Sequence, residues 1–248
     1  MALINISNRY INDVKWLNTK QFNFTINLNT IDIYRIDIGL NLTNLDDFAA
    51  LLKPDETERA NKYFYAKDKN RSIISRGALR YILGRYLQQS PGSIEFGVGI
   101  NKKPYIKNNT NNICYNISHS GNWILIAIAN SEIGTDIELI NPDFNYKEVL
   151  SDNFSVNEIN HINQNNPLET FYLLWTRKEA LTKASGKGLD EDLKLIPCLD
   201  GDQLADSKIV SLNCDTSVSS FTPCNQYVCS VATGKTVNEI RFWDIDFY

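Results

Sequence analysis

The chain has 248 residues, of which 43% are hydrophobic and 22% charged, and its formal net charge is -4. This length can bury a sizeable core in one large domain or two modest ones without disulfide bonds to stabilise it. The slightly acidic balance argues against broad electrostatic binding of nucleic acid, since proteins that bind in this way carry clustered Lys and Arg. Any contact with a polyanion must therefore be local.

The cysteines and the apolar runs indicate the compartment. The five cysteines form no C-x-x-C pair and the two histidines lie far from them in sequence, so a structural zinc site is not indicated and reduced thiols are expected. The N-terminus has no basic stretch followed by an apolar run. The longest strongly apolar run, residues 123–129, is far shorter than the ~20 residues that cross a bilayer. We therefore expect a cytoplasmic protein without membrane contact.

The first half of the chain is expected to begin with an irregular arm over residues 1–30, which are rich in Asn with scattered apolar positions. Residues 31–38 alternate apolar and polar side chains and predict the first strand. Helices are expected at 45–52, from Pro54, and over 68–87, where apolar residues recur at helical spacing. The last of these helices is expected to carry a polar face of four arginines: Arg71, Arg76, Arg80 and Arg85.

The second half is expected to contain most of the strands. Residues 123–129 are continuously apolar, which indicates a strand buried on both faces. Residues 130–131 predict a turn into a strand at 133–140, so that the two strands form a hairpin. Helices are expected at 156–162 and 168–185, and glycines end the second of them. Further strands are expected at 94–98, 103–106, 208–212, 227–232 and 240–244.

Three carboxylates and a lysine are the most informative polar residues. Asp136 and Glu138 lie two apart in a predicted strand, so their side chains emerge on the same face. Glu179 and Lys183 lie four apart in a run of helix formers, which places a third carboxylate and an ammonium group on one helical face. Three carboxylates repel one another unless a cation lies between them. The simpler alternative is a solvated acid pair on a strand and an ion pair on a helix surface.

The chemistry of these groups favours a hard metal ion and a phosphorylated substrate. Oxygen ligands without nearby Cys or His favour Mg²⁺, or Mn²⁺, over zinc, and Mg²⁺ often combines carboxylates with substrate phosphate oxygens. Lys183 is suited to neutralise charge on such a phosphate. Glu179 is placed to accept a proton from an attacking hydroxyl group.

The segment Ser118-His119-Ser120-Gly121 precedes the buried strand and offers a hydroxyl, an imidazole and free amides to a phosphate. Adjacent Ser and His residues also suggest nucleophilic catalysis. However, neighbours on a strand point to opposite faces and do not easily form the hydrogen-bonded pair that such catalysis needs. Phosphate binding is therefore the preferred hypothesis, and a histidine satisfied by nearby backbone is the simpler alternative.

Taken together, the motifs resemble those of the longer, Sfp-type 4'-phosphopantetheinyl transferases. The shared pattern is N-I-S-H-S at 116–120, I-G-T-D-I-E at 133–138, W-T-R-K-E-A-L-T-K at 175–183 and G-K-G-L at 186–189. A lone G-x-D-I-E is a weak signal, whereas this combination in this order is specific, and the resemblance extends over about residues 31–232.

The resemblance and the order of elements imply the same fold. The order of strands and helices predicts the α+β class, with helices packed on small, mostly antiparallel sheets. The resemblance implies a monomer of two pseudo-twofold, duplicated α/β halves with coenzyme A between them. Here the halves would be residues 1–132, including the arm, and residues 133–248.

The resemblance also implies the reaction. The family transfers the 4'-phosphopantetheine group of coenzyme A to a serine of an apo acyl or peptidyl carrier protein and releases 3',5'-ADP. By this resemblance, Mg²⁺ on Asp136, Glu138 and Glu179 would bridge the coenzyme A pyrophosphate. Glu179 would act as the general base, directly or through a water. Lys183 would support the pyrophosphate and Lys178 would help to polarise it.

The same resemblance suggests the contacts of the nucleotide. Arg71 and His119 would bind the 3'-phosphate, and Ser118 would lie near the same nucleotide. Lys103 matches a family lysine, although Lys102 stands where the family has glycine. A further basic residue, Arg59, would also reach the nucleotide.

The carrier protein and the alternatives are less constrained by the sequence. Local candidates for contact with an acidic carrier are Arg76, Arg80 and Lys178. One alternative function is a coenzyme A or carrier-binding module without turnover. Another is a different Mg²⁺-dependent phosphotransferase, which is disfavoured because no P-loop or kinase signature is present.

Overall fold

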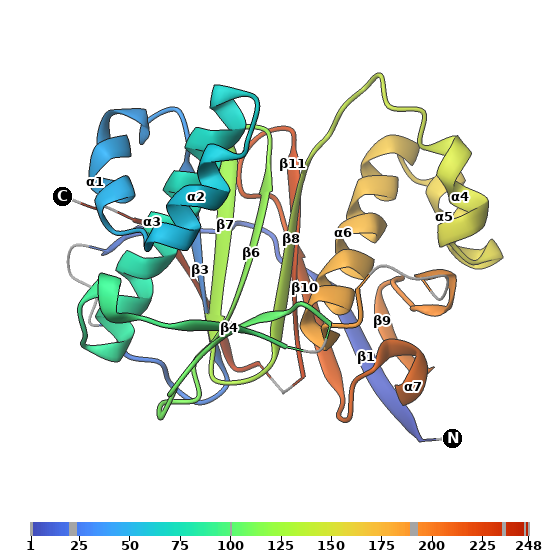
Figure 1. Ribbon diagram of the computed structural model, residues 1–248. Coiled ribbons are helices and arrows are strands. Elements are labelled where there is room, and N and C mark those ends of the chain that lie inside the picture. The colour runs from blue at the N-terminus through green and yellow to red at the C-terminus, as the bar shows by residue number, and fades with distance from the viewer. Residues whose placement is uncertain are drawn as a thin grey trace.

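The computed structural model describes residues 2–19, 24–99, 101–188, 193–234, 237–245 and 247. Two five-stranded sheets lie in the middle of the molecule, with helices α1 to α3 on one side and α4 to α6 on the other (Figure 1). This arrangement confirms the α+β class. Within the described ranges, no helix is long and apolar enough to cross a membrane.

The first sheet has the strand order β2-β12-β3-β7-β6. Strands β3, β7 and β6 are antiparallel neighbours, whereas β12 runs parallel to both β3 and β2. The strands span Leu17–Asn18 (β2), Thr30–Asp37 (β3), Cys114–Ser120 (β6), Trp123–Ala129 (β7) and Glu239–Asp244 (β12). The helices beside this sheet are Leu45–Ala50 (α1), Pro54–Asn61 (α2) and Ala66–Leu87 (α3), with short 3-10 turns at Leu42–Asn44 (η2) and Pro91–Ser93 (η3).

The second sheet has the order β8-β11-β10-β1-β9 and is antiparallel except where β1 pairs with β10. Its strands span Leu3–Tyr10 (β1), Ile133–Leu139 (β8), Gly201–Asp206 (β9), Thr216–Phe221 (β10) and Tyr227–Thr233 (β11). The other elements are Lys147–Asn153 (α4), Val156–Gln164 (α5), Pro167–Ser185 (α6), Leu193–Leu195 (η4) and Ser207–Val210 (α7), and a small hairpin of Phe96–Val98 (β4) and Pro104–Ile106 (β5).

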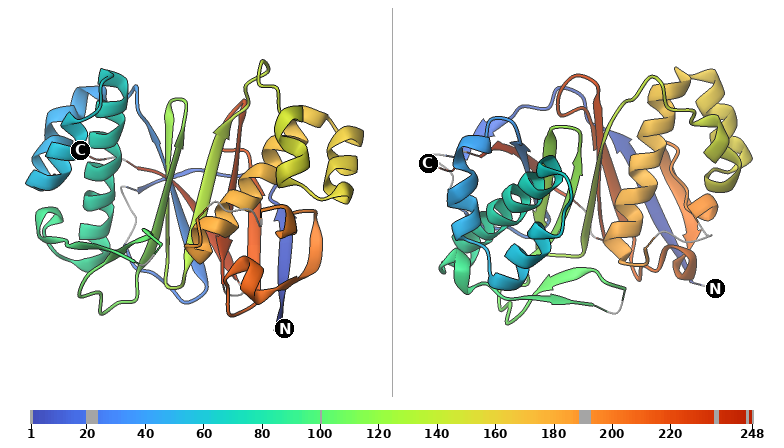
Figure 2. Two further views of the ribbon diagram at one scale, coloured as in Figure 1. Left: turned by 45° about the vertical axis from the view of Figure 1, so that its right-hand side comes forward. Right: turned by 45° about the horizontal axis from the view of Figure 1, so that its top comes forward.

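The two sheets pack face to face between the long helices α3 and α6, as the views in Figure 2 show. Strand β7 illustrates why. Its even-numbered residues, such as Ile126, belong to the core under α3, and its odd-numbered residues, such as Leu125, belong to the core between the sheets. The prediction of a strand buried on both faces is therefore confirmed.

Both halves contain the same β-α-β-β unit. In the first unit the order along the chain is β3, α3, β6 and β7, and in the second it is β8, α6, β10 and β11. In each unit the third strand lies between the other two, which gives β3-β7-β6 and β8-β11-β10. This shared topology agrees with the expected duplication.

The ends of the chain cross between the two units, which corrects the expectation of an irregular arm. Residues of β1 form a regular strand in the second sheet, between β10 and β9. Conversely, β12 completes the first sheet, beside β3. The expected boundary at 132/133 separates β7 from β8. However, β1 belongs to the sheet of the second half, and β12 belongs to the sheet of the first half. Residues 1 and 20–23 of the arm lie outside the described residues.

Two further element predictions are wrong. Strands β7 and β8 do not pair as a hairpin, because β7 is already bonded to β3 and β6 while β8 pairs with β11. The chain instead changes sheets at residues 130–132. Residues 208–212 were expected to be a strand, but most of them belong to the short helix α7, which Asp206 caps by accepting a hydrogen bond from the Lys208 amide.

Candidate active site

A glycine allows β8 and α6 to approach each other closely. A side chain on Gly134 would place its Cβ 2.1 Å from the Ala180 carbonyl oxygen and 2.2 Å from the Ala184 amide nitrogen. Only glycine fits between this strand and this helix. The close approach brings Lys183 of α6 onto Asp136 of β8, with 2.6 Å between Nζ and Oδ1. At the far end of the helix, Gly186 adopts a φ of 70° and ends α6 as predicted, whereas Leu189 lies outside the described residues.

Asp136 is buried and only half satisfied. Its side chain is 4% exposed, and its Oδ1 accepts hydrogen bonds from Ser118 Oγ at 2.8 Å and from Lys183 Nζ. Its Oδ2 is also buried and has no hydrogen-bond partner among the described residues. An unpaired buried oxygen of this kind costs about 1–3 kcal/mol, and more when the group is charged. The atom is therefore suited to a cation.

Glu138 and Glu179 share the electrostatic field of Asp136. Burial raises the pKa of Glu138, and the charge of Asp136 raises it further. Burial likewise raises the pKa of Glu179 to about 7, Asp136 and Glu138 add to the effect, and Lys183 opposes it. The charge of Asp136 thus disfavours ionisation of both glutamates, in line with the repulsion expected among these carboxylates.

The donor set fits a hard divalent cation such as Mg²⁺ or Mn²⁺, since it consists of carboxylate oxygens with one buried oxygen left unpaired. In the described part of the chain, no three Asp, Glu, His or Cys side chains are close enough together in their present positions to coordinate a metal ion. Lys183 supplies the positive charge beside Asp136 in this arrangement. Binding of a metal would therefore require Lys183 or the carboxylates to move.

A basic pocket lies on the other side of β6, between α2 and α3. It has a volume of about 260 Å³, and Arg59, Arg71 and His119 all line it. Arg71 forms an ion pair of 2.8 Å with Asp68 one turn away. Burial and the neighbouring Arg71 charge lower the pKa of His119, which keeps its imidazole neutral near pH 7. The structure thus brings together three of the five side chains that the resemblance assigned to the nucleotide.

Strand β6 separates the two groups because its side chains alternate. Ser118 points toward β8 and contacts Asp136, while its neighbour His119 lines the basic pocket. The expectation that the Ser118 hydroxyl lies with the nucleotide contacts is therefore corrected, since this hydroxyl belongs to the acidic group. The sequence argument against a Ser-His nucleophilic pair is supported by the same geometry.

Lys103 lies outside the basic pocket. Its Nζ is 2.5 Å from Glu132 Oε2 and 2.6 Å from the Ala184 carbonyl oxygen, so it connects the β4-β5 hairpin to the end of α6. Lys102 has a φ of 62°, in the left-handed region that favours glycine. The turn typical of glycine is therefore kept although lysine replaces it.

Lys178 and Arg80 are buried in ion pairs that stabilise the fold. This corrects the predictions that Lys178 contacts the pyrophosphate or the carrier and that Arg80 lies on an exposed polar face. Lys178 is fully buried, and its Nζ contacts Glu158 at 3.0 Å and the carbonyl oxygens of Leu193 and Ile196. Its charge is neutralised inside the protein and has no contact with solvent. Arg80 is 1% exposed and binds both carboxylate oxygens of Glu56, so it is not part of an exposed polar face. Arg76 stays partly exposed, lines the basic pocket and pairs with Glu56 at 3.3 Å.

Sequence reasoning did not anticipate Ser120 as a site residue. Its Oγ donates a hydrogen bond of 2.9 Å to Glu138 Oε2, just as Ser118 does to Asp136. The available signal was the spacing, because residues two apart on one strand face the same neighbour.

Comparisons with known proteins agree with this site. Residues 42–131 match the family model described as 4'-phosphopantetheinyl transferase, N-terminal, and residues 132–232 match that of the 4'-phosphopantetheinyl transferase superfamily. The two matches meet within the turn at which the chain changes sheets. The chain belongs to the 4'-phosphopantetheinyl transferase family.

Individual relatives support the same assignment. The 4'-phosphopantetheinyl transferase HetI of Nostoc sp. is 31% identical over 180 residues, which cover 70% of this chain and 76% of the relative. The 4'-phosphopantetheinyl transferase Sfp of Bacillus subtilis is 27% identical over 201 residues, with 80% and 83% covered. As a member of this enzyme family, the protein transfers phosphopantetheine from coenzyme A to carrier proteins.

Proposed function

We propose that the transfer depends on a divalent metal, Mg²⁺ or Mn²⁺, held by Asp136, Glu138 and Glu179. The observation that carries this proposal is the buried, unpaired Oδ2 of Asp136. The raised pKa values of Glu138 and Glu179 support it, because burial and then the charge of Asp136 raise both, and a bound cation would offset these effects. When bound, the metal supplies positive charge to the coenzyme A pyrophosphate and to the transition state.

Glu179 is proposed as the general base for the carrier serine, directly or through a water. Its pKa of about 7 in the metal-free protein is better matched to proton transfer at neutral pH than that of an ordinary carboxylate. Lys183 lies one turn later on the same helix and is 30% exposed. Its ammonium group can therefore leave Asp136 to support the pyrophosphate.

Coenzyme A is proposed to lie across strand β6, with its two charged groups, the 3'-phosphate and the pyrophosphate, on opposite sides. Arg71, His119 and Arg59 would bind the 3'-phosphate in the basic pocket, whereas the pyrophosphate would lie near the acidic group. Lys103 would reach the phosphates only if it left Glu132. We further propose that the enzyme acts as a monomer on apo acyl or peptidyl carrier proteins.

The direct test is incubation with coenzyme A, Mg²⁺ and several apo carrier proteins, followed by intact-mass measurement of each carrier. A phosphopantetheine-sized gain is expected on at least one carrier, and chelation with EDTA should prevent it. If no carrier gains mass, the chain is a binding module without turnover. If transfer proceeds equally in EDTA, the metal proposal is wrong.

Glu179→Gln tests the proposed base. We expect it nearly to abolish transfer while binding of coenzyme A stays measurable by calorimetry. Glu169→Gln is the matched control, because Glu169 is an exposed residue in the first turn of the same helix. Undiminished transfer by Glu179→Gln would remove Glu179 from this role.

A further inference from the structure

The two sheets are joined along β6 and β8 by side chains. Three β6 side chains accept hydrogen bonds from alternate β8 amides: Asn116 Oδ1 from Thr135 (2.9 Å), Ser118 Oγ from Ile137 (3.4 Å) and Ser120 Oγ from Leu139 (3.0 Å). In the described part of the chain, β6 and β8 form no backbone ladder with each other. We call this row of three contacts the β6-β8 seam.

Two members of the seam also donate to carboxylates, and Ser118 Oγ accepts a further hydrogen bond from Lys183 Nζ at 3.1 Å. Ser118 Oγ donates to Asp136 Oδ1 at 2.8 Å, and Ser120 Oγ donates to Glu138 Oε2 at 2.9 Å. A serine hydroxyl has one proton to donate. Because a β8 amide fixes one side of each hydroxyl oxygen, the single proton is directed to the carboxylate. Asn116 differs, since among the described residues it forms no hydrogen bond to a carboxylate.

We propose that Ser118 and Ser120 are positioning residues that orient the metal-binding carboxylates. Each hydroxyl holds one carboxylate oxygen and so assigns the other oxygen to the cation, namely Oδ2 of Asp136 and Oε1 of Glu138. The unpaired state of Asp136 Oδ2 agrees with this division. Hydrogen bonds from outer groups to metal-binding side chains typically change metal affinity or activity by about 10–100-fold when removed.

This inference rests on the metal site proposed above and goes beyond it, because it assigns roles to two residues outside the ligand set. It also gives a reason why both serines belong to one strand. Residues 118 and 120 have the same spacing as residues 136 and 138, so two parallel rows of side chains meet residue by residue. An acid or amide in place of either serine would not provide the same contact.

The test is the affinity for Mn²⁺, measured from the free-ion signal in electron paramagnetic resonance, with the melting temperature recorded for each variant. We expect Ser118→Ala and Ser120→Ala to raise the Mn²⁺ Kd by about 10–100-fold. Ser120→Thr, which keeps the hydroxyl group, should restore most of the affinity. Asn116→Ala is the matched control, because it breaks the same kind of seam contact and should lower the melting temperature without weakening Mn²⁺ binding.

Two results would overturn the proposal. One is wild-type Mn²⁺ affinity in both alanine variants. The other is equal weakening in Asn116→Ala, which would show that the seam acts only by holding the sheets together. Asp136→Asn distinguishes failure of the metal site itself: if this variant binds Mn²⁺ as tightly as the wild type, the proposed site is misplaced and both proposals fail.

Discussion

Two buried aspartates occupy the first strands of the two β-α-β-β units, Asp32 on β3 and Asp136 on β8. Asp32 is fully buried, and both its oxygens are paired. Oδ1 accepts from Arg241 and Trp243, and Oδ2 from Arg241 and Tyr86. Asp136 is almost as buried, yet its Oδ2 has no partner among the described residues. The two aspartates are therefore similarly buried but differ in their hydrogen bonds: both oxygens of Asp32 are paired, and one oxygen of Asp136 is not.

In this protein a paired buried carboxylate stabilises the fold, whereas a buried carboxylate with an unpaired oxygen among the described residues marks the candidate site. Asp32 connects three segments that are distant in sequence, namely β3, α3 and β12, and removal of such a group is costly. Asp136 keeps one oxygen free at an energetic cost, and strain of this kind is retained where it serves function.

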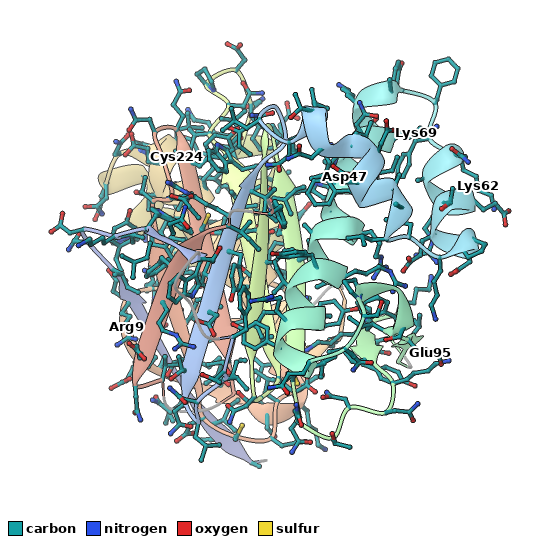
Figure 3. The ribbon with its side chains drawn as sticks, turned by 90° about the vertical axis from the view of Figure 1, so that its left-hand side faces the viewer. Arg9, Asp47, Lys62, Lys69, Glu95 and Cys224 are labelled. Carbon is teal, nitrogen blue, oxygen red and sulfur yellow. The ribbon has the colours of Figure 1, made fainter. Side chains whose placement is uncertain are left out.

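Asp136→Asn should have the largest effect on catalysis. We expect transfer to fall by about 10³-fold or more, because a ligand for the charge-stabilising cation is lost. The melting temperature should change little, since a neutral amide is easier to bury than a half-satisfied carboxylate. Initial rates of carrier modification measure the effect. Asp47→Asn, on the exposed surface of α1 (Figure 3), is the control for loss of one negative charge.

Asp32→Asn should show the opposite pattern. The amide would present hydrogens to donors that now bind a carboxylate, and the Arg241 charge would lose its partner. We expect the free energy of unfolding in urea to fall by about 3–5 kcal/mol. Below the new melting temperature, the folded fraction should keep its coenzyme A affinity. A stable Asp32→Asn variant with weakened coenzyme A binding would refute the division.

The two lysines of α6 extend the comparison. Lys178→Met should lower the free energy of unfolding by about 3 kcal/mol, because it leaves Glu158 buried without its cation. Lys183→Met should cost less stability, since its side chain is 30% exposed and water can replace it, but it should lose most of the transfer activity. Urea denaturation and carrier modification measure the two effects. A transfer defect in folded Lys178→Met protein would restore Lys178 as an active-site residue.

The smallest expected effect is a pH dependence of stability in EDTA. The pKa of Glu179 rises from 4.5 in the unfolded chain to about 7 in the metal-free folded protein. Between these values the folded state holds a proton that the unfolded state has released, so the contribution is present below pH 4.5 and is lost as the pH rises through 7. We expect a loss of about 1–2 kcal/mol, reduced by partial solvent screening of Glu179.

Glu179→Gln provides the control for this pH effect. The glutamine side chain does not titrate, so the difference in stability between wild type and variant should change across pH 5 to 8. Parallel curves for the two proteins would contradict the raised pKa.

The sequence predicted most of what depends on local pattern. The helices α3 and α6, the buried strand β7 and the strand with Asp136 and Glu138 follow from side-chain periodicity, which is a local property. The pairing partners of β8 did not follow, because they depend on which neighbouring edge is free after β7 is bonded on both sides. The strand β1 was missed although Ile4 and Ile6 alternate with polar residues, because this alternation is short and the third buried position is the polar Asn8, in an Asn-rich segment.

The sequence predicted which charged residues form the candidate site, but it did not predict all of the contacts that these residues make. The acidic residues on β8 and α6 follow from spacing. The burial of Lys178 did not follow, because the three groups that bind its ammonium come from other segments of the chain. The role of Ser120 likewise depends on the lateral position of β6 relative to β8, which periodicity within one strand does not specify.

The β6-β8 seam also bears on how the protein avoids self-association. Both strands are at an edge of their sheets, and an exposed edge is a template on which a second chain can add a strand. Here the hydroxyl and amide oxygens of β6 accept hydrogen bonds from three β8 amides, so the β8 edge does not offer these donors to another molecule. The seam therefore makes β8 a poor template for strand addition by a second chain.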